Sequence, residues 1–200
     1  MKIGLIFECG PQGADKQVCE YLAKKINPNA EYLSKTLDNK DNLLNQAAEI
    51  AKGLIEIDQC DRILIIWDLR PSWPDMKTKP CRFAERQRLL SDLQASGLQN
   101  QSISLVCIEQ EFESWLLADK DAVNSFLSRP THTYNGATTV SRPDNEKNPK
   151  SRMMKYFKEA RGFKYDDKVH AIGIVKQECL SLKKLRHSVS FSRFENKLQN

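Results

Sequence analysis

Three short, almost continuous apolar segments, each followed directly by acidic residues, constrain the fold of this chain most strongly. They cover residues 2–7, 62–67 and 103–108. Segments of this length and composition indicate strands that are buried on both faces, as in a parallel sheet covered by helices. Between the first two segments, apolar residues recur with helical spacing at 14–26 and 39–57. We therefore expect an α/β fold with a mostly parallel central sheet flanked by helices.

Acidic side chains end each of the three expected strands. Glu8 follows the first strand, Asp68 follows the second, and Glu109, Glu111 and Glu113 follow the third. Because the carboxyl ends of parallel strands share one edge of a sheet, residues that end different strands can meet there. Converging carboxylates are typical ligands of hard cations such as Mg²⁺ or Mn²⁺. The pattern predicts a metal site for phosphate chemistry, in which the cation polarises the phosphate and activates water.

A helix N-terminus that favours acidic residues is the alternative explanation for the third acidic cluster. It accounts for one or two glutamates better than for three, since three close carboxylates repel one another unless a cation or a basic group neutralises them. We expect a helix to begin near Gln110 and to turn Phe112, Trp115 and Leu116 inward.

Arg70 lies in a proline-rich loop, residues 68–74, that follows the second expected strand. Two prolines restrict its backbone, which suits a positioned site more than a mobile linker. The helix expected over 81–96 carries Arg82 and Arg86 on a basic face. These arginines are candidate phosphate ligands, and the alternative is that they are solvated or paired with acidic residues of the same helix.

Charge is distributed unevenly along the chain. Residues 1–128 contain 15 basic and 19 acidic residues, a net charge of −4, whereas residues 129–200 contain 16 basic and 7 acidic residues, a net charge of +9. Such a division is typical of two solvated faces as well as of a phosphate-binding rear. We expect an α/β core over 1–127, a long loop over 128–148 and a basic helical part over 149–200, packed on the core as a single domain overall.

The basic rear offers one candidate anion site. A helix is expected to begin at Pro149 with Lys150 and Arg152 in its first turn. Free backbone amides and the helix dipole favour anions there, so both residues are candidate phosphate ligands; two exposed cations at a helix start are the alternative. Near the C-terminus, Phe191 and Phe194 are expected to pack the last helix on the sheet.

Six cysteines are present without a Cys-x-x-Cys pair or a Cys/His ligand spacing. They indicate reduced, mostly buried thiols and not disulfides or zinc ligands. The first residues form an expected strand instead of a secretory leader, and no apolar run approaches the roughly 18 residues needed to cross a bilayer. We therefore expect a cytoplasmic protein without membrane contact.

The acidic residues after successive strands resemble the Toprim arrangement of topoisomerases, primases and a group of phage-defence nucleases. More narrowly, five segments resemble a Toprim-like family known as domain of unknown function 4276. They are W-D-L-R-P-S-W at 67–73, C-x3-E-R at 81–86, C-I-E-Q-E-F-E-S-W-L-L-A-D at 107–119, N-P-K at 148–150 and S-x-S-F-x-R-F at 188–194. The resemblance spans nearly the whole chain, and the segment at 107–119 is its most specific element.

The resemblance implies a Toprim-like, Rossmann-like fold and metal-dependent cleavage of a phosphodiester bond, as in nucleases of mobile elements and phage-defence loci. Mg²⁺ or Mn²⁺ would be the cofactor, nucleic acid the substrate, and a protein from the same locus a further partner. The implied metal ligands are Glu8, Asp68, Glu109, Glu111 and Glu113. The implied catalytic residues are Glu8, Asp68, Glu111 and Arg70. The candidate phosphate ligands, which the charge pattern of the chain indicates, are Arg70, Arg82, Arg86, Lys150 and Arg152.

The second acidic motif departs from the Toprim pattern. That family has D-x-D, whereas this chain has Asp68 followed by Leu69 and Arg70. Either Glu111 or Glu113 provides the missing oxygen, or the site binds metal weakly and Arg70 contacts the phosphate directly. The alternative function is therefore a non-catalytic module with a degenerate Toprim site that binds nucleic acid, a nucleotide or a partner protein.

Overall fold

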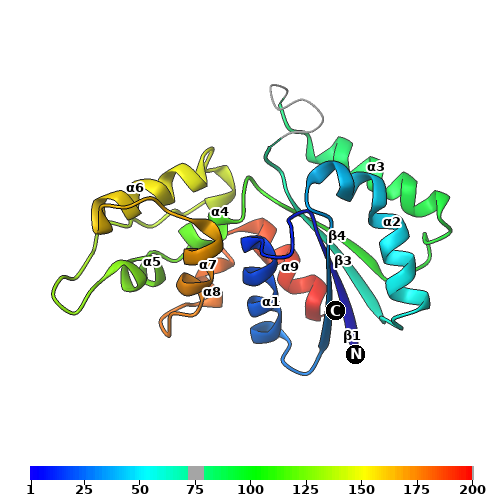
Figure 1. Ribbon diagram of the computed structural model, residues 1–200, viewed down its shortest axis with the longest axis horizontal. Helices are drawn as coiled ribbons and strands as arrows, with labels where there is room; N and C mark the ends of the chain where they lie inside the picture. Colours follow the sequence, from blue (N-terminus) through cyan, green and yellow to red (C-terminus); the bar gives the residue numbers. More distant parts are fainter. Residues whose placement is uncertain (72–78, 200) are drawn as a thin grey trace. The chain divides into compact units, whose positions relative to one another are not determined.

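The computed structural model describes residues 1–71 and 79–199, and Figure 1 shows its helices and strands. The chain forms two compact units. The first contains residues 1–107 and the C-terminal residues from Lys197 onward, and the second contains residues 108–196. This boundary differs from the expected end of the core at residue 127, because the helices that follow residue 108 pack against later helices of the chain.

A four-stranded sheet forms the centre of the first unit. Its strands are β1 (Lys2–Phe7), β2 (Glu31–Thr36), β3 (Arg62–Asp68) and β4 (Ile103–Ile108), in the order β2-β1-β3-β4. β1 pairs in parallel with β2 and with β3, so that Phe7 lies beside Thr36 on one side and Ile66 on the other. The expected α/β class with a parallel central sheet is confirmed.

β2 is the strand that the sequence does not predict. Its residues are mostly polar, and the strand is only partly buried. It lies at one edge of the sheet, beyond β1. An edge strand is less enclosed than a central one, so it lacks the continuous apolar run that reveals β1, β3 and β4.

Helices cover both faces of this sheet (Figure 1). α1 (Ala14–Ile26) lies on one face, and α2 (Lys40–Glu56) and α3 (Arg82–Ala95) lie on the other. α2 begins after Asn39, whose side chain accepts a hydrogen bond from the backbone N of Asn42 (2.9 Å). The buried stripe from Leu43 to Leu54 packs α2 into the main core cluster, together with apolar residues of β3 and α3.

The strand order places β1 between the two strands that follow it in the chain. α1 connects β1 to β2 on one side, and α2 then carries the chain back past β1 to β3 on the other side. Connections that diverge in this way mark the usual ligand position in open α/β sheets, beyond the carboxyl ends of the strands. Glu8 directly follows β1 and Asp68 ends β3, so both lie at this position.

The second unit consists of short helices and one long irregular segment. The helices are α4 (Glu113–Leu117), α5 (Lys120–Leu127), α6 (Pro149–Arg161), α7 (Asp167–Val175), α8 (Leu182–Leu185) and α9 (Val189–Gln199), whose last residues, from Lys197, belong to the first unit. Residues 128–148 contain an isolated bridge between Arg129 and His132 and the short 3-10 helix η1 (Pro143–Asn145), and are otherwise irregular. The long loop expected from the sequence is therefore present.

Trp115 of α4 is central to the packing of this unit. Its ring centroid lies 5.3 Å from those of both Phe191 and Phe194, and its Nε1 donates a hydrogen bond to Ser190 Oγ (2.8 Å). The two phenylalanines thus pack against α4, and their expected contact with the sheet stays a prediction. The helix expected from near Gln110 was also placed too early, since α4 begins at Glu113.

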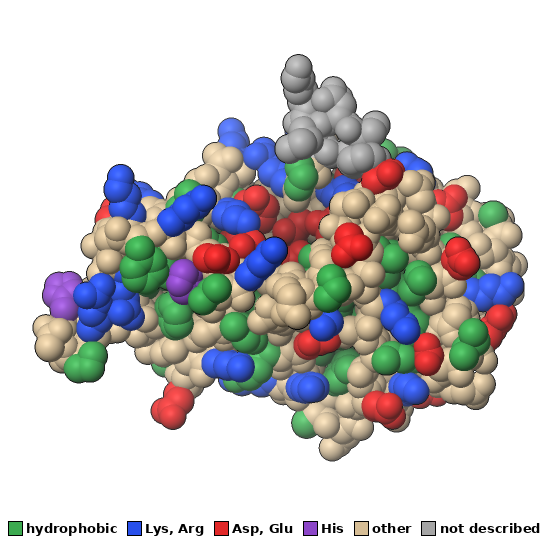
Figure 2. Space-filling model, viewed as in Figure 1, with side chains coloured by type: hydrophobic (Ala, Val, Ile, Leu, Met, Phe, Trp, Pro, Cys, Tyr) green, Lys and Arg blue, Asp and Glu red, His purple; other side chains and the backbone are tan. Residues whose placement is uncertain are grey.

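Acidic and basic side chains are intermixed on the face that Figure 2 shows, in both units. Much of the basic charge of the second unit is paired within that unit, as the site contacts below show. None of the helices described is long and apolar enough to cross a membrane. All six cysteines are free thiols, and Cys19, Cys60 and Cys107 are buried.

Asp119 is a fully buried carboxylate that joins two segments of the second unit. It accepts hydrogen bonds from the backbone N atoms of Asp121, Ala122 and Ser181, and its Oδ1 lies 3.0 Å from Lys184 Nζ. Four donors around one carboxylate satisfy its charge without water.

We predict that Asp119→Ala lowers the free energy of unfolding by about 2–4 kcal/mol, because it leaves buried N–H donors without an acceptor. Asp166→Ala is the matched control, since Asp166 caps α7 from an exposed position through the N of Lys168. We expect that control to cost about 0.5–1 kcal/mol. Urea unfolding measures both values, and equal losses would contradict the role assigned to Asp119.

Candidate metal centre

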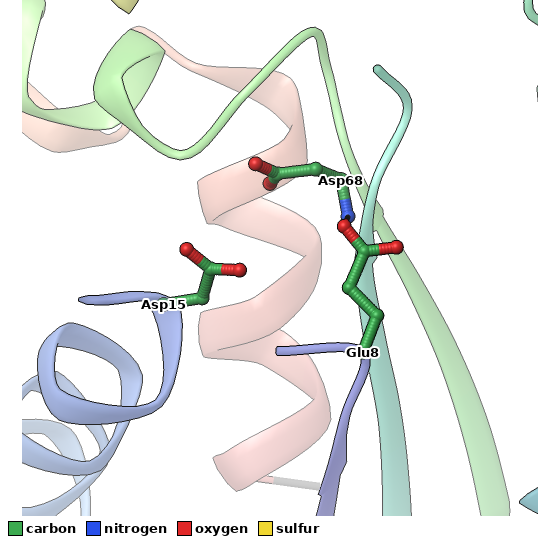
Figure 3. Close-up of side chains that lie close together, drawn as sticks. All are labelled: Glu8, Asp15 and Asp68. Atoms are coloured by element: carbon green, nitrogen blue, oxygen red, sulfur yellow. Dashed lines mark hydrogen bonds between the residues drawn. The ribbon is translucent and has the colours of Figure 1, made fainter. Parts of the chain in front are cut away.

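The carboxylates of Glu8, Asp15 and Asp68 come together at the carboxyl edge of the sheet (Figure 3). One oxygen of each lies within 4.8 Å of one oxygen of each of the others. Within residues 1–71 and 79–199, no other group of three or more His, Cys, Asp or Glu side chains is arranged to hold a metal ion. All three residues belong to the first unit.

Adjacent strands place two of these carboxylates. Glu8 follows β1, and Asp68 is the last residue of β3. The backbone N of Asp68 donates a hydrogen bond to Glu8 Oε1 (3.1 Å), which holds the glutamate side chain across the strand ends. Asp15 comes from α1, and its carboxylate points toward the other two in Figure 3.

A tight turn between β1 and α1 brings Asp15 into the cluster. The backbone N of Gly13 donates to the carbonyl oxygen of Gly10 (2.8 Å). A Cβ at position 13 would lie 2.4 Å from Cys9 Sγ, so the turn has room only for glycine there. The sequence suggests Asp15 only as a favourable charge in the first helical turn. The signal that could have identified it is an acidic residue in the first turn of the helix that begins after a glycine turn following Glu8.

Burial dominates the electrostatics of Glu8. The pKa of Glu8 is raised to about 8, chiefly by burial and also by the charges of Asp15 and Glu85, while Lys40 and the hydrogen bond from the backbone N of Asp68 partly offset this rise. Glu8 Oε2 is buried and has no hydrogen-bond partner among the described residues. An unsatisfied buried oxygen beside two other carboxylates fits a hard divalent cation.

Cys9 lies next to this cluster and does not add a thiolate to it. Burial raises the pKa of the Cys9 thiol to about 12, with further contributions from the charges of Asp15, Glu8 and Asp68. The thiol is therefore protonated at neutral pH. The donors that remain are oxygens, which suit Mg²⁺ or Mn²⁺ better than zinc or copper.

Lys40 fixes the turn that follows Asp68. Its buried Nζ donates hydrogen bonds to the carbonyl oxygens of Leu69 (2.9 Å) and Pro71 (2.6 Å). Arg70 lies between these two residues, so its backbone is held at the edge of the cluster. The positive charge of the same ammonium favours ionised Glu8.

Glu85 of α3 completes the support of Lys40. Its Oε1 lies 3.5 Å from Lys40 Nζ, and its Oε2 accepts a hydrogen bond from Trp67 Nε1 (2.8 Å). Glu85 is buried, whereas Arg82 and Arg86 on the same helix are exposed. The acidic residue of the C-x3-E-R segment therefore supports the turn, and the phosphate role of the two arginines stays a prediction.

The three glutamates that follow β4 lie in the second unit and have contacts there. Glu109 forms an ion pair with Arg193 (2.5 Å), and Glu111 Oε2 accepts a hydrogen bond from the backbone N of Lys150 (3.3 Å). Glu113 is a buried residue that begins α4. The cluster in the first unit consists of Glu8, Asp15 and Asp68, and none of the three glutamates after β4 belongs to it. Their assignment as metal ligands stays a prediction.

The two cations predicted at the start of α6 are both paired with carboxylates. Lys150 Nζ lies 2.6 Å from Asp167, and Arg152 Nη1 lies 2.5 Å from Glu146. Their role as phosphate ligands stays a prediction, and a phosphate there would share both cations with these carboxylates. The remaining loop residues of the W-D-L-R-P-S-W segment, Ser72, Trp73 and the following Pro74, lie outside the residues that the structure describes.

We predict that Lys40→Met lowers the free energy of unfolding by about 3 kcal/mol, because it leaves Glu85 buried without its cation and two carbonyls without a donor. Lys52→Met is the matched control on the same helix, where Lys52 is exposed and lies 3.9 Å from Glu56. It should change stability by less than about 0.5 kcal/mol. Denaturant unfolding of both variants measures the difference. A loss as small as that of Lys52→Met would refute the support role of Lys40.

A second prediction concerns pH in the absence of divalent cations. The folded-state pKa of Glu8, about 8, lies above the ordinary value of 4.5, so between these values the folded protein holds a proton that the unfolded chain has lost. The free energy of unfolding should therefore fall as pH rises from about 5 to 8, by up to about 3–4 kcal/mol from this group. Glu8→Gln should remove that part of the decline. Urea unfolding in EDTA across this range measures it, and parallel curves for the two proteins would disprove it.

Comparison with known families adds a relationship but no activity. A family described as Domain of unknown function (DUF4276) matches residues 12–199, a span that contains Asp15 and Asp68 and begins after Glu8. Searches of curated proteins and of solved structures found no match. Since the match covers almost the whole chain, the protein belongs to the DUF4276 family.

Proposed function

We propose that the protein is a Mg²⁺- or Mn²⁺-dependent phosphodiester hydrolase, a nuclease of the Toprim-like type. The observation that carries this proposal is the convergence of Glu8, Asp15 and Asp68, with oxygens within 4.8 Å of one another and Glu8 Oε2 buried without a described partner. The cluster lies where open α/β sheets bind ligands. Bound there, the cation would polarise a phosphate and lower the pKa of water.

The residues of the chain have separate tasks in this proposal. Glu8, Asp15 and Asp68 hold the cation, and the hydrogen bond from the N of Asp68 keeps Glu8 oriented. Lys40 fixes the backbone of the turn that carries Arg70, and in this proposal the guanidinium of Arg70 contacts the substrate phosphate. Nucleic acid as the substrate, and a role in phage defence, come from the Toprim resemblance.

A non-catalytic binding module is the second candidate. Arg70 occupies the position at which the Toprim pattern has its second aspartate, which reduces the negative charge available to a cation. A cation must also displace the proton that a pKa of about 8 keeps on Glu8 at neutral pH. Both features favour weak metal binding, and such a module would bind nucleic acid without cleaving it.

We predict that Glu8→Gln, Asp15→Asn and Asp68→Asn each weaken Mn²⁺ binding at least roughly tenfold, because each removes one charged oxygen ligand. Asp41→Asn is the matched control, since Asp41 is the second residue of α2 just as Asp15 is the second residue of α1. Isothermal titration calorimetry at pH 8 measures the affinities. Equal affinity in all four variants and the parent protein would eliminate the metal site.

The same variants separate the two functions. With Mn²⁺ or Mg²⁺, the parent protein should cleave single-stranded DNA, duplex DNA or RNA, and Glu8→Gln and Asp68→Asn should lose roughly a hundredfold or more of that rate. Asp41→Asn should retain it. Metal and nucleic-acid binding without any cleavage would instead identify the binding module.

A further inference from the structure

A polar hollow in the second unit is lined by more basic than acidic side chains. It has a volume of about 530 Å³ and is lined by residues 139–142, residues 145–148 and Arg152. A second hollow of about 430 Å³ shares Glu146, Asn148 and Arg152 with it. Hollows of this size can hold a ligand as large as a nucleotide.

The charge in the first hollow is unbalanced. Its three cations are Arg142, Lys147 and Arg152, and its one carboxylate is Glu146, which gives a net charge of +2. The hydrogen bond from Arg152 lowers the pKa of Glu146, so this carboxylate is ionised and its charge is neutralised by Arg152. Arg142 and Lys147 are exposed and have no ion-pair partner in the part of the chain that the structure describes. Two positive charges therefore remain available to a ligand.

Arg152 is held in a fixed orientation at the wall of this hollow. Its Nε donates to Tyr156 Oη (2.9 Å), its Nη1 to Glu146 (2.5 Å) and its Nη2 to Thr138 Oγ1 (3.0 Å). A guanidinium has five N–H donors, so two of them have no partner among the described residues. The backbone N of Thr138 also donates to Tyr156 Oη (3.3 Å), which ties the loop to α6.

We propose that this hollow binds a phosphate group, presented either by a nucleic-acid backbone or by a free nucleotide. Arg142 and Lys147 provide the charge, Arg152 provides oriented N–H donors, and the exposed hydroxyls of Thr139 and Ser141 provide neutral donors. Cations combined with Ser or Thr hydroxyls are the usual protein ligands of phosphate oxygens.

This phosphate site does not depend on the metal centre. Every residue that lines the hollow belongs to the second unit, whereas Glu8, Asp15 and Asp68 belong to the first. Phosphate binding should therefore persist in EDTA and in Glu8→Gln. The two proposals can fail separately.

The test compares two double variants that each remove two positive charges from exposed positions of the second unit. Arg142→Gln/Lys147→Gln changes the hollow, and Lys158→Gln/Lys164→Gln changes lysines that do not line it. Fluorescence anisotropy with a labelled single-stranded oligonucleotide, at several salt concentrations in EDTA, measures polymer binding. Calorimetry with ADP and with inorganic phosphate measures binding of the free anion.

We expect Arg142→Gln/Lys147→Gln to weaken binding at least roughly tenfold. The slope of log binding constant against log salt concentration should become shallower by about one to two. The control should change affinity by less than about twofold. Loss confined to the oligonucleotide identifies a nucleic-acid backbone as the source of the phosphate, and loss confined to ADP or inorganic phosphate identifies a free anion. Equal losses in both double variants, no loss in either, or no binding of any probe to the parent protein would overturn the proposal.

Discussion

The cost of placing carboxylates together in a partly dehydrated position is the constraint on which the first unit depends. Parallel pairing of β1 with β3 brings Glu8 and Asp68 to one edge, and the glycine turn adds Asp15. Without a cation, the fold accommodates this arrangement by keeping Glu8 largely protonated at neutral pH. The cation that we propose for this site would offset the same cost by neutralising the carboxylates.

Lys40 reduces the electrostatic cost of ionising Glu8 without removing it. Its ammonium favours ionised Glu8, but its hydrogen bonds go to the carbonyls of Leu69 and Pro71 and its ion pair goes to Glu85. The charge of Lys40 is thus largely committed to Glu85 and to the backbone turn. The turn that bears Arg70 therefore keeps a defined backbone.

The parts of the fold that are predictable from the sequence are those with one dominant physical signal. β1, β3 and β4 are continuous apolar runs, so burial alone reveals them and places Glu8 and Asp68 at strand ends. β2 is a polar edge strand that is recognisable only from its pairing with β1. Asp15 joins the cluster through the geometry of the Gly10–Gly13 turn, which residue spacing does not encode.

The basic residues of the second unit show why a count of charges is a poor guide to a binding surface. Lys150, Arg152, Lys184 and Arg193 all have carboxylate partners inside the unit, so the regular helices use much of their positive charge for their own packing. Arg142 and Lys147 lie instead in the irregular segment before α6, without such a partner among the described residues. Long loops in compact units are often functional, and these two cations line a hollow of suitable size for the phosphate group that we propose.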